Sequence, residues 1–180
     1  IQGVNTMNQK LKQLTNRIHY LPHKPETDRP ILSAVCGMHQ TLIIDAGNSN
    51  EHAELFLSEL DQYQITKYNS VVLTHWHWDH SFGMDQMNML TIAHENTKIH
   101  LEKMMEYEWS DENLDKRVEK GLENPICSEM IKKEFGADRN ITVIPPNITF
   151  KEKLEIDLGG IRCIIKHVGG DHSDDSSIIF

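Results

Sequence analysis

Short apolar and β-branched runs alternate with amphipathic stretches along this chain, a pattern that predicts a mixed α/β protein. In the first half, strands are expected at residues 17–21, 31–36, 41–45 and 70–74. Between the last two, Asn48–Gln62 is expected to be an amphipathic helix capped by Ser49 or Asn50. In the second half, strands are expected at residues 141–144, 148–150, 153–158 and 161–166, with another beginning at residue 176.

The remaining stretches are polar or helical in pattern. Residues 1–16 are polar, which predicts a lead-in or a short helix. Within 84–90, Met84, Met87 and Leu90 recur at helical spacing, which favours packing in the core. Further helices are expected in the charged middle of the chain, around residues 98–109, 111–120 and 128–135.

Length and charge narrow the class of protein. A chain of 180 residues fits one domain, residues 1–180, with a substantial core. The formal net charge is −9, and the chain contains no run of lysine or arginine. Both features argue against nucleic acid or an anionic membrane as a partner. Cys36, Cys127 and Cys163 form no CxxC pair, and no apolar run approaches a membrane span. We therefore expect a cytoplasmic protein without a disulfide framework, although the chain begins at Ile1 and a leader could have been removed.

The stretch that carries the most chemistry is Thr74–His80, where three histidines and one aspartate fall within six residues. It follows a short apolar run and precedes a turn signal, so we expect it where a buried strand ends and a loop begins. In an extended backbone alternate side chains share a face. His75, His77 and Asp79 would then project together, and His80 would return from the loop.

These side chains are suited to binding metal ions. Imidazole nitrogens and carboxylate oxygens are ligands of zinc, iron and manganese. The spacing suits two ions better than one, with His75 and His77 on the first and Asp79 and His80 on the second. The alternative is an exposed polar loop that happens to be rich in histidine, but four potential ligands directly after a buried strand favour the metal site.

The HxHxDH motif at residues 75–80 resembles the metal motif of the metallo-beta-lactamase superfamily. Upstream, Leu42–Gly47 resembles the early strand of that family that ends in Asp-x-Gly. Downstream, Gly169–Ser173 resembles the turn that supplies a third histidine. Three motifs in the expected order imply the α/β metallo-beta-lactamase fold, an αββα sandwich. They imply no particular substrate.

The resemblance also implies roles for single residues. His172 would be the third ligand of the first metal, beside His75 and His77. Asp79 would ligate the second metal together with His80, orient the nucleophile and carry a proton to the leaving group. Zinc is the expected metal, with two ions per complete site, and iron or manganese are the alternatives.

Two further expectations concern the surroundings of the metals. Asp45, at the end of a buried strand, would lie beneath the metal loop and hold it through hydrogen bonds, or it would simply cap the turn that follows. Residues 95–136 would form a helical insertion or cap over the active site, or an ordinary solvated helical face.

Other residues near the motifs are expected outside the metal site. Trp76 and Trp78 would pack the ligand segment against the core rather than touch substrate. His94 and His100 would be surface or core-edge histidines, and His167 is not a favoured ligand. Solvated turn carboxylates are expected at Asp171, Asp174 and Asp175.

The implied function is a metal-dependent hydrolase that acts on a small molecule. A metal-bound hydroxide would attack an ester, thioester, lactone, lactam or phosphodiester. A diiron redox protein of the same fold is an alternative, although such relatives usually carry a carboxylate where this chain has His77. A non-catalytic metal-binding fragment is another.

The resemblance predicts two later ligands, a bridging aspartate and a final histidine, that match no residue here. We therefore expect the fold to be incomplete at the C-terminus and the isolated chain to be inactive if its second site stays half built. Nothing in the sequence indicates an oligomeric state.

Overall fold

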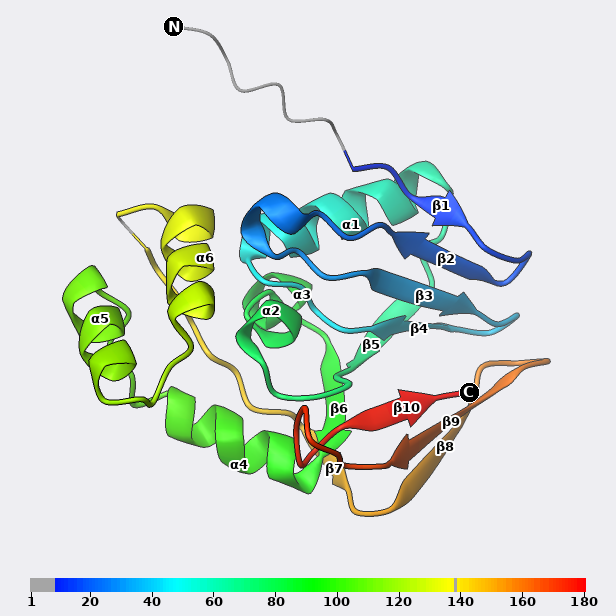
Figure 1. Ribbon diagram of the computed structural model, residues 1–180. Coiled ribbons are helices and arrows are strands. Elements are labelled where there is room, and N and C mark those ends of the chain that lie inside the picture. Colours follow the sequence, from blue (N-terminus) through cyan, green and yellow to red (C-terminus); the bar gives the residue numbers. More distant parts are fainter. Residues whose placement is uncertain (1–8, 138) are drawn as a thin grey trace, which may run out of the picture.

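The computed structural model describes residues 9–137 and 139–180, which form two β-sheets with helices packed on one side (Figure 1). The large sheet has seven strands in the order β1 to β7. The small sheet has three strands in the order β10-β9-β8. The large sheet consists of β1 Lys12–Gln13, β2 Ile18–Leu21, β3 Leu32–Cys36, β4 Thr41–Ile44, β5 Tyr68–Val72, β6 Leu90–His94 and β7 Ile148–Phe150. The small sheet consists of β8 Lys153–Asp157, β9 Arg162–His167 and β10 Ser177–Ile179.

The large sheet begins as a meander and continues as a parallel sheet. Neighbouring strands from β1 to β4 are antiparallel, whereas β4 to β7 run parallel. Parallel neighbours need crossover connections, and helices provide them. These connections contain α1 Asn50–Gln62, α2 Trp78–Ser81, α3 Met84–Met87, α4 Glu95–Met104, α5 Asp111–Glu119 and α6 Pro125–Phe135, while the short 3₁₀ helix η1 Pro25–Thr27 lies between β2 and β3.

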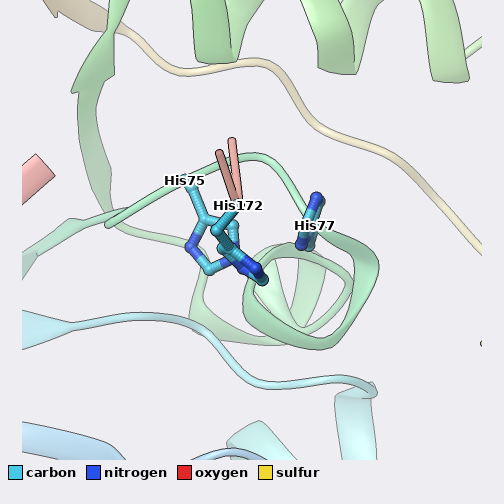
Figure 2. Close-up of side chains that lie close together, drawn as sticks. All are labelled: His75, His77 and His172. Carbon is cyan, nitrogen blue, oxygen red and sulfur yellow. The ribbon is translucent and has the colours of Figure 1, made fainter. Parts of the chain in front are cut away.

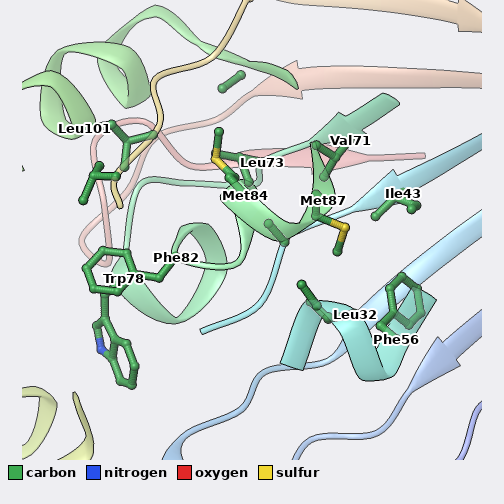
Figure 3. Close-up of a cluster of buried hydrophobic side chains, with 14 of the residues drawn as sticks. Leu32, Ile43, Phe56, Val71, Leu73, Trp78, Phe82, Met84, Met87 and Leu101 are labelled. Atoms are coloured by element: carbon green, nitrogen blue, oxygen red, sulfur yellow. The ribbon is translucent and has the colours of Figure 1, made fainter. Parts of the chain in front are cut away.

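Alternation of side chains along the central strands produces two hydrophobic cores. Ile43 of β4 and Val71 of β5 face the helices and pack in the same cluster as Phe56 of α1 (Figure 3). Their neighbours Leu42 and Val72 point the other way, into a second cluster that includes the small sheet. Successive residues of a strand point to opposite faces, so a strand that is apolar throughout can bury both. The described residues therefore form three layers, helices, large sheet and small sheet, as the α/β expectation requires.

Several predicted elements are confirmed. Helix α1 lies within the predicted segment, and the Ser49 hydroxyl caps it by accepting a hydrogen bond from the His52 amide at 3.1 Å. The four strands predicted in the first half, and the strands predicted at 148–150, 153–158 and 161–166, are present with shifts of a few residues at their ends. None of the helices in residues 9–137 and 139–180 is long and apolar enough to cross a membrane.

Other predictions were wrong. Helix α3 ends at Met87, with Asn88 in the left-handed conformation (φ 43°), and the chain then enters β6, which the sequence analysis missed. The segment 141–144 is not a strand: it is irregular, and its Val143 side chain packs into the helical core. The two prolines at 145 and 146 lack the amide hydrogens that a sheet needs. Residues 9–16 form no helix, and the rest of the predicted lead-in lies outside the described residues.

Candidate metal centre

The candidate metal ligands gather at the edge where the parallel strands of the large sheet end. Asp45 directly follows β4, and the 74–80 segment follows β5. The carboxyl ends of neighbouring parallel strands meet at one edge of a sheet, where sites are commonly built. The loop between β9 and β10 reaches the same edge, because the amide of Ser177 donates to the carbonyl of Thr74 at 2.8 Å. That contact brings His172 beside the motif, although the two lie far apart in the chain.

The ligand segment was expected to be extended, but it is not. Residues 74–77 have no regular structure, and His77 occupies the N-cap position of α2. Asp79 and His80 therefore lie in the first helical turn rather than on a continued strand. The helical turn places the side chains of Asp79 and His80 next to each other, whereas an extended backbone would point them to opposite faces.

Three imidazoles converge beside α2: those of His75, His77 and His172 (Figure 2). One ligand atom from each lies within 4.8 Å of the others, and Nε2 of His75 lies 3.1 Å from Nε2 of His172. Ligand nitrogens of a tetrahedral zinc ion lie about 3.3 Å apart, given bonds of about 2.0–2.1 Å. Small side-chain rotations would therefore bring all three nitrogens onto one ion, so this set could hold a metal.

Two of the three histidines are held in the neutral form that a metal requires. Burial and the neighbouring charges of His80 and His77 lower the pKa of His75 to about 4. Burial and the charge of His172 also lower the pKa of His77. At neutral pH both rings keep a nitrogen lone pair available for coordination.

Asp79 and His80 form a second pair beside this cluster. Oδ2 of Asp79 lies 3.1 Å from Nε2 of His80, and the opposite ring nitrogen, Nδ1, lies 2.8 Å from Oδ2 of Asp45. Burial alone would lower the pKa of His80, but the two carboxylates outweigh it and raise that pKa to about 10. Burial would raise the pKa of Asp79, but the hydrogen bond and charge of His80 keep it below its usual value.

Asp45 connects the two groups of side chains. Its carboxylate is almost fully buried and accepts hydrogen bonds from the Thr74 amide at 2.8 Å and the Thr74 hydroxyl at 3.0 Å. That hydroxyl lies 3.0 Å from Nδ1 of His75. When the hydroxyl donates to Asp45, it can accept only from a protonated Nδ1, which leaves Nε2 of His75 free. The same carboxylate holds Nδ1 of His80, so one buried acid orients two imidazoles.

Hydrogen bonds connect the loop that carries His172 to α4, and the sequence did not predict them. Asp175 is fully buried, accepts a hydrogen bond from the Thr97 hydroxyl at 2.7 Å and is bonded by the Ser173 hydroxyl. The expectation that Asp175 is solvated was therefore wrong, whereas Asp174 is exposed as expected. No local signal could reveal the contact, because Thr97 lies on a helix 78 residues away.

The other histidines lie outside the cluster, as expected. His94 is buried at the end of β6 and stacks on His167, with ring centroids 3.8 Å apart. His100 stacks on Trp76 with centroids 4.9 Å apart and pairs with Asp174 at 2.8 Å. These contacts support the loop of the third histidine and the segment that carries the motif.

A cavity of about 440 Å³ opens beside His77 and Asp79. Trp76 and Trp78 pack against the helical core, as expected, but both also line this cavity. Its opposite wall comes from the segment between α4 and α6, including Trp109. The candidate metal centre is thus next to a space large enough for a small organic molecule.

Comparisons with known proteins agree with this arrangement. The sequence profile of the metallo-beta-lactamase superfamily matches residues 33–180. A metallo-beta-lactamase from Pontibacter korlensis superposes with a TM-score of 0.61 at 16% identity, covering 96% of this chain and 66% of its own. The subclass B3 metallo-beta-lactamase BJP-1 of Bradyrhizobium japonicum gives 0.60 at 13% identity, covering 93% and 55%. A double mutant of the sec-alkyl sulfatase PisA1 gives 0.64 at 13% identity, covering 96% and 29%. No curated protein sequence matches the chain.

The chain belongs to the metallo-beta-lactamase superfamily. The predicted fold class is confirmed, and the chain spans about one half to two thirds of the length of the metallo-beta-lactamases that it resembles. At these identities the structural likeness establishes the fold alone. Lactamases and an alkyl sulfatase share it, so the fold does not determine the substrate.

Proposed function

We propose that this chain forms the metal centre of a metal-dependent hydrolase of small molecules. The observation that supports the proposal most directly is the convergence of His75, His77 and His172, within 4.8 Å, from two distant segments. Three histidines with a coordination position left open are a common ligand set of catalytic zinc. We assign zinc as the metal, with a second ion on Asp79 and His80 completed by ligands beyond those identified here.

The donor set fits such ions, because His75 and His77 are neutral and the Asp79 carboxylate is ionised at neutral pH, whereas His80 would give up a proton when a metal binds. When bound, zinc lowers the pKa of a coordinated water toward neutrality and polarises the oxygen of the bond that is cleaved. The chain supplies the geometry: Asp79, ionised at neutral pH, would orient the attacking water, take up a proton from it and pass that proton to the leaving group. Asp45 acts through the Thr74 hydroxyl to leave Nε2 of His75 free, and it holds Nδ1 of His80 so that Nε2 of that ring faces Asp79.

We further propose that the chain is one domain in which the 95–136 segment acts as a cap. Helices α4 to α6 lie at the same end of the large sheet as α2 (Figure 1). Residues from this segment form one wall of the cavity beside His77. This position favours a cap over an ordinary solvated helical face, because residues of the segment line the same cavity as the candidate metal ligands His77 and Asp79.

Hydrolysis by the zinc-loaded protein tests the proposal. A chromogenic panel would contain a β-lactam, a lactone, a thioester, an aryl ester and a phosphodiester, assayed before and after chelation. At least one substrate should be hydrolysed only with metal, and His75→Ala should abolish that activity. The control is His39→Ala, an exposed histidine at the opposite end of β4 from Asp45. Metal-independent activity, or full activity in His75→Ala, would contradict the proposal.

A further inference from the structure

We propose that the cavity beside α2 binds an apolar, uncharged group of the substrate and discriminates against an anionic one. This inference rests on the proposed function, because the cavity is next to the candidate metal ligands His77 and Asp79. It extends that function by naming the chemical character of the group that lies next to the bond under attack.

The walls of the cavity are mainly aromatic and aliphatic. Trp76 and Trp78 come from the ligand segment, and Trp109, Met104 and Leu122 come from the opposite wall. At 440 Å³ the cavity is within the range of sites that hold drug-sized molecules. Burial of an apolar group there is favourable because it removes apolar surface from water.

The charged groups in the described lining are acidic. Asp79 and Glu123 both line the cavity, and no lysine or arginine of the described residues does. Glu123 is partly buried, and this burial raises the pKa of its carboxyl group. A second negative charge beside the ionised carboxylate of Glu123 would be repelled, and more strongly where water is excluded. An anionic group in the cavity would therefore be disfavoured unless it displaced or neutralised Glu123.

The aromatic rings add little to the binding of a cationic group. Cations bind over the faces of aromatic rings. One face of Trp109 already carries the guanidinium of Arg117, 4.7 Å from the ring centroid. One face of Trp76 is stacked on His100. Two of the three indoles thus have one face occupied, and between an uncharged apolar group and an anion the lining favours the uncharged group.

The three indoles provide a direct assay. The chain has three tryptophans, and all of them line this cavity, so intrinsic fluorescence reports on its occupancy. Two acetanilides that differ in the para substituent would be titrated into the zinc-loaded protein: 4-ethylacetanilide and 4-acetamidobenzoate. We expect saturable binding of the ethyl compound and at least about tenfold weaker binding of the carboxylate.

A pair of matched variants tests where the ligand binds. Leu122 lines the cavity and Ile126 does not, yet both are about two-thirds exposed, so a lysine at either position leaves the core untouched. Leu122→Lys should strengthen binding of the carboxylate about tenfold, whereas Ile126→Lys should leave it unchanged. Glu123→Gln should also improve binding of the carboxylate.

Repeating the titrations after chelation separates the two proposals. A carboxylate that binds through a metal loses its binding on chelation, whereas one that binds in the cavity does not. The inference is overturned if the carboxylate binds in the chelated protein as tightly as the ethyl compound, or if Leu122→Lys and Ile126→Lys behave alike. Selective binding of the ethyl compound without any metal-dependent hydrolysis would support the cavity and contradict the proposed hydrolase instead.

Discussion

Replacing Asp45 by asparagine removes one negative charge and little else. Asp45 has a left-handed backbone conformation, with φ of 63°. Asparagine tolerates that conformation about as well as aspartate, whereas alanine would add strain. An asparagine oxygen can still accept from the Thr74 amide, but its NH₂ group then faces Nδ1 of His80, which Asp45 contacts at 2.8 Å. Two donors would point at each other, which disfavours the protonated Nδ1 and so lowers the pKa of His80.

The structure sets the size of the effect. A hydrogen bond to a charged group contributes about 1.5–3 kcal/mol, so its loss should lower the pKa of His80 by about 1–2 units from its value of about 10. Once His80 of the variant loses a proton, the neutral ring keeps the remaining one on Nε2, the nitrogen that faces Asp79. Zinc affinity should fall about 10- to 100-fold, as for other residues that orient metal ligands.

Two measurements read these changes separately. Imidazole ¹⁵N NMR of the metal-free protein gives the pKa and the tautomer of His80, and competition with a chromophoric chelator gives the zinc affinity. The control is Asp61→Asn, since Asp61 accepts a hydrogen bond from Tyr68 on the surface, away from the cluster. A folded Asp45→Asn protein with an unchanged pKa of His80 and zinc affinity within twofold of the original would refute the role assigned to Asp45.

Three further predictions follow from the network, from a buried histidine and from the metal. Thr97→Val leaves the buried Asp175 carboxylate without one donor and should lower the free energy of unfolding by about 1–3 kcal/mol in urea denaturation; a change under about 0.5 kcal/mol would contradict the network. Burial and the charge of Arg29 lower the pKa of His52 to about 3. Below about pH 6.5 the unfolded chain therefore binds a proton at His52 that the folded chain does not bind. The free energy of unfolding should fall from pH 6.5 toward pH 3 by up to about 1.4 kcal/mol per pH unit. His52→Leu should flatten that slope between pH 4 and 6 by about one proton, and an unchanged slope would exclude His52 as its source. Zinc at 100 times its dissociation constant should raise the melting temperature by about 5–10 °C, a shift that chelation reverses and that His75→Ala lacks; an equal shift in that variant would point to binding elsewhere.

The sequence predicted the parts of the fold that depend on local pattern. Apolar runs with β-branched residues located most strands, and Ser49 marked the start of α1. The pattern failed at β6, where the methionines of 84–90 suggested one helix, although Asn88 turns the chain into a strand. It also failed at 141–144, because an apolar run can pack as irregular chain against helices.

The candidate site was predicted for residues of the short motifs and for Asp45, which hydrogen-bonds Thr74 and His80, but not for the support from Asp175. His75, His77 and His172 lie together as the resemblance implied. The pairing of Thr97 with Asp175 depends on tertiary contact, and neither residue type signals it. The helical turn at Asp79 was missed because the alternating motif also fits an extended chain. The cytoplasmic location and the lack of nucleic-acid binding stay predictions.

The most direct test of the metal centre is the zinc content per chain, measured by elemental analysis after reconstitution and dialysis. His172→Ala would be compared with His39→Ala, which removes an exposed histidine outside the cluster. We expect at least one zinc ion per chain in the original protein and in His39→Ala, and the loss of one ion in His172→Ala. Full zinc content in His172→Ala, or no zinc in any of the three proteins, would contradict the three-histidine centre.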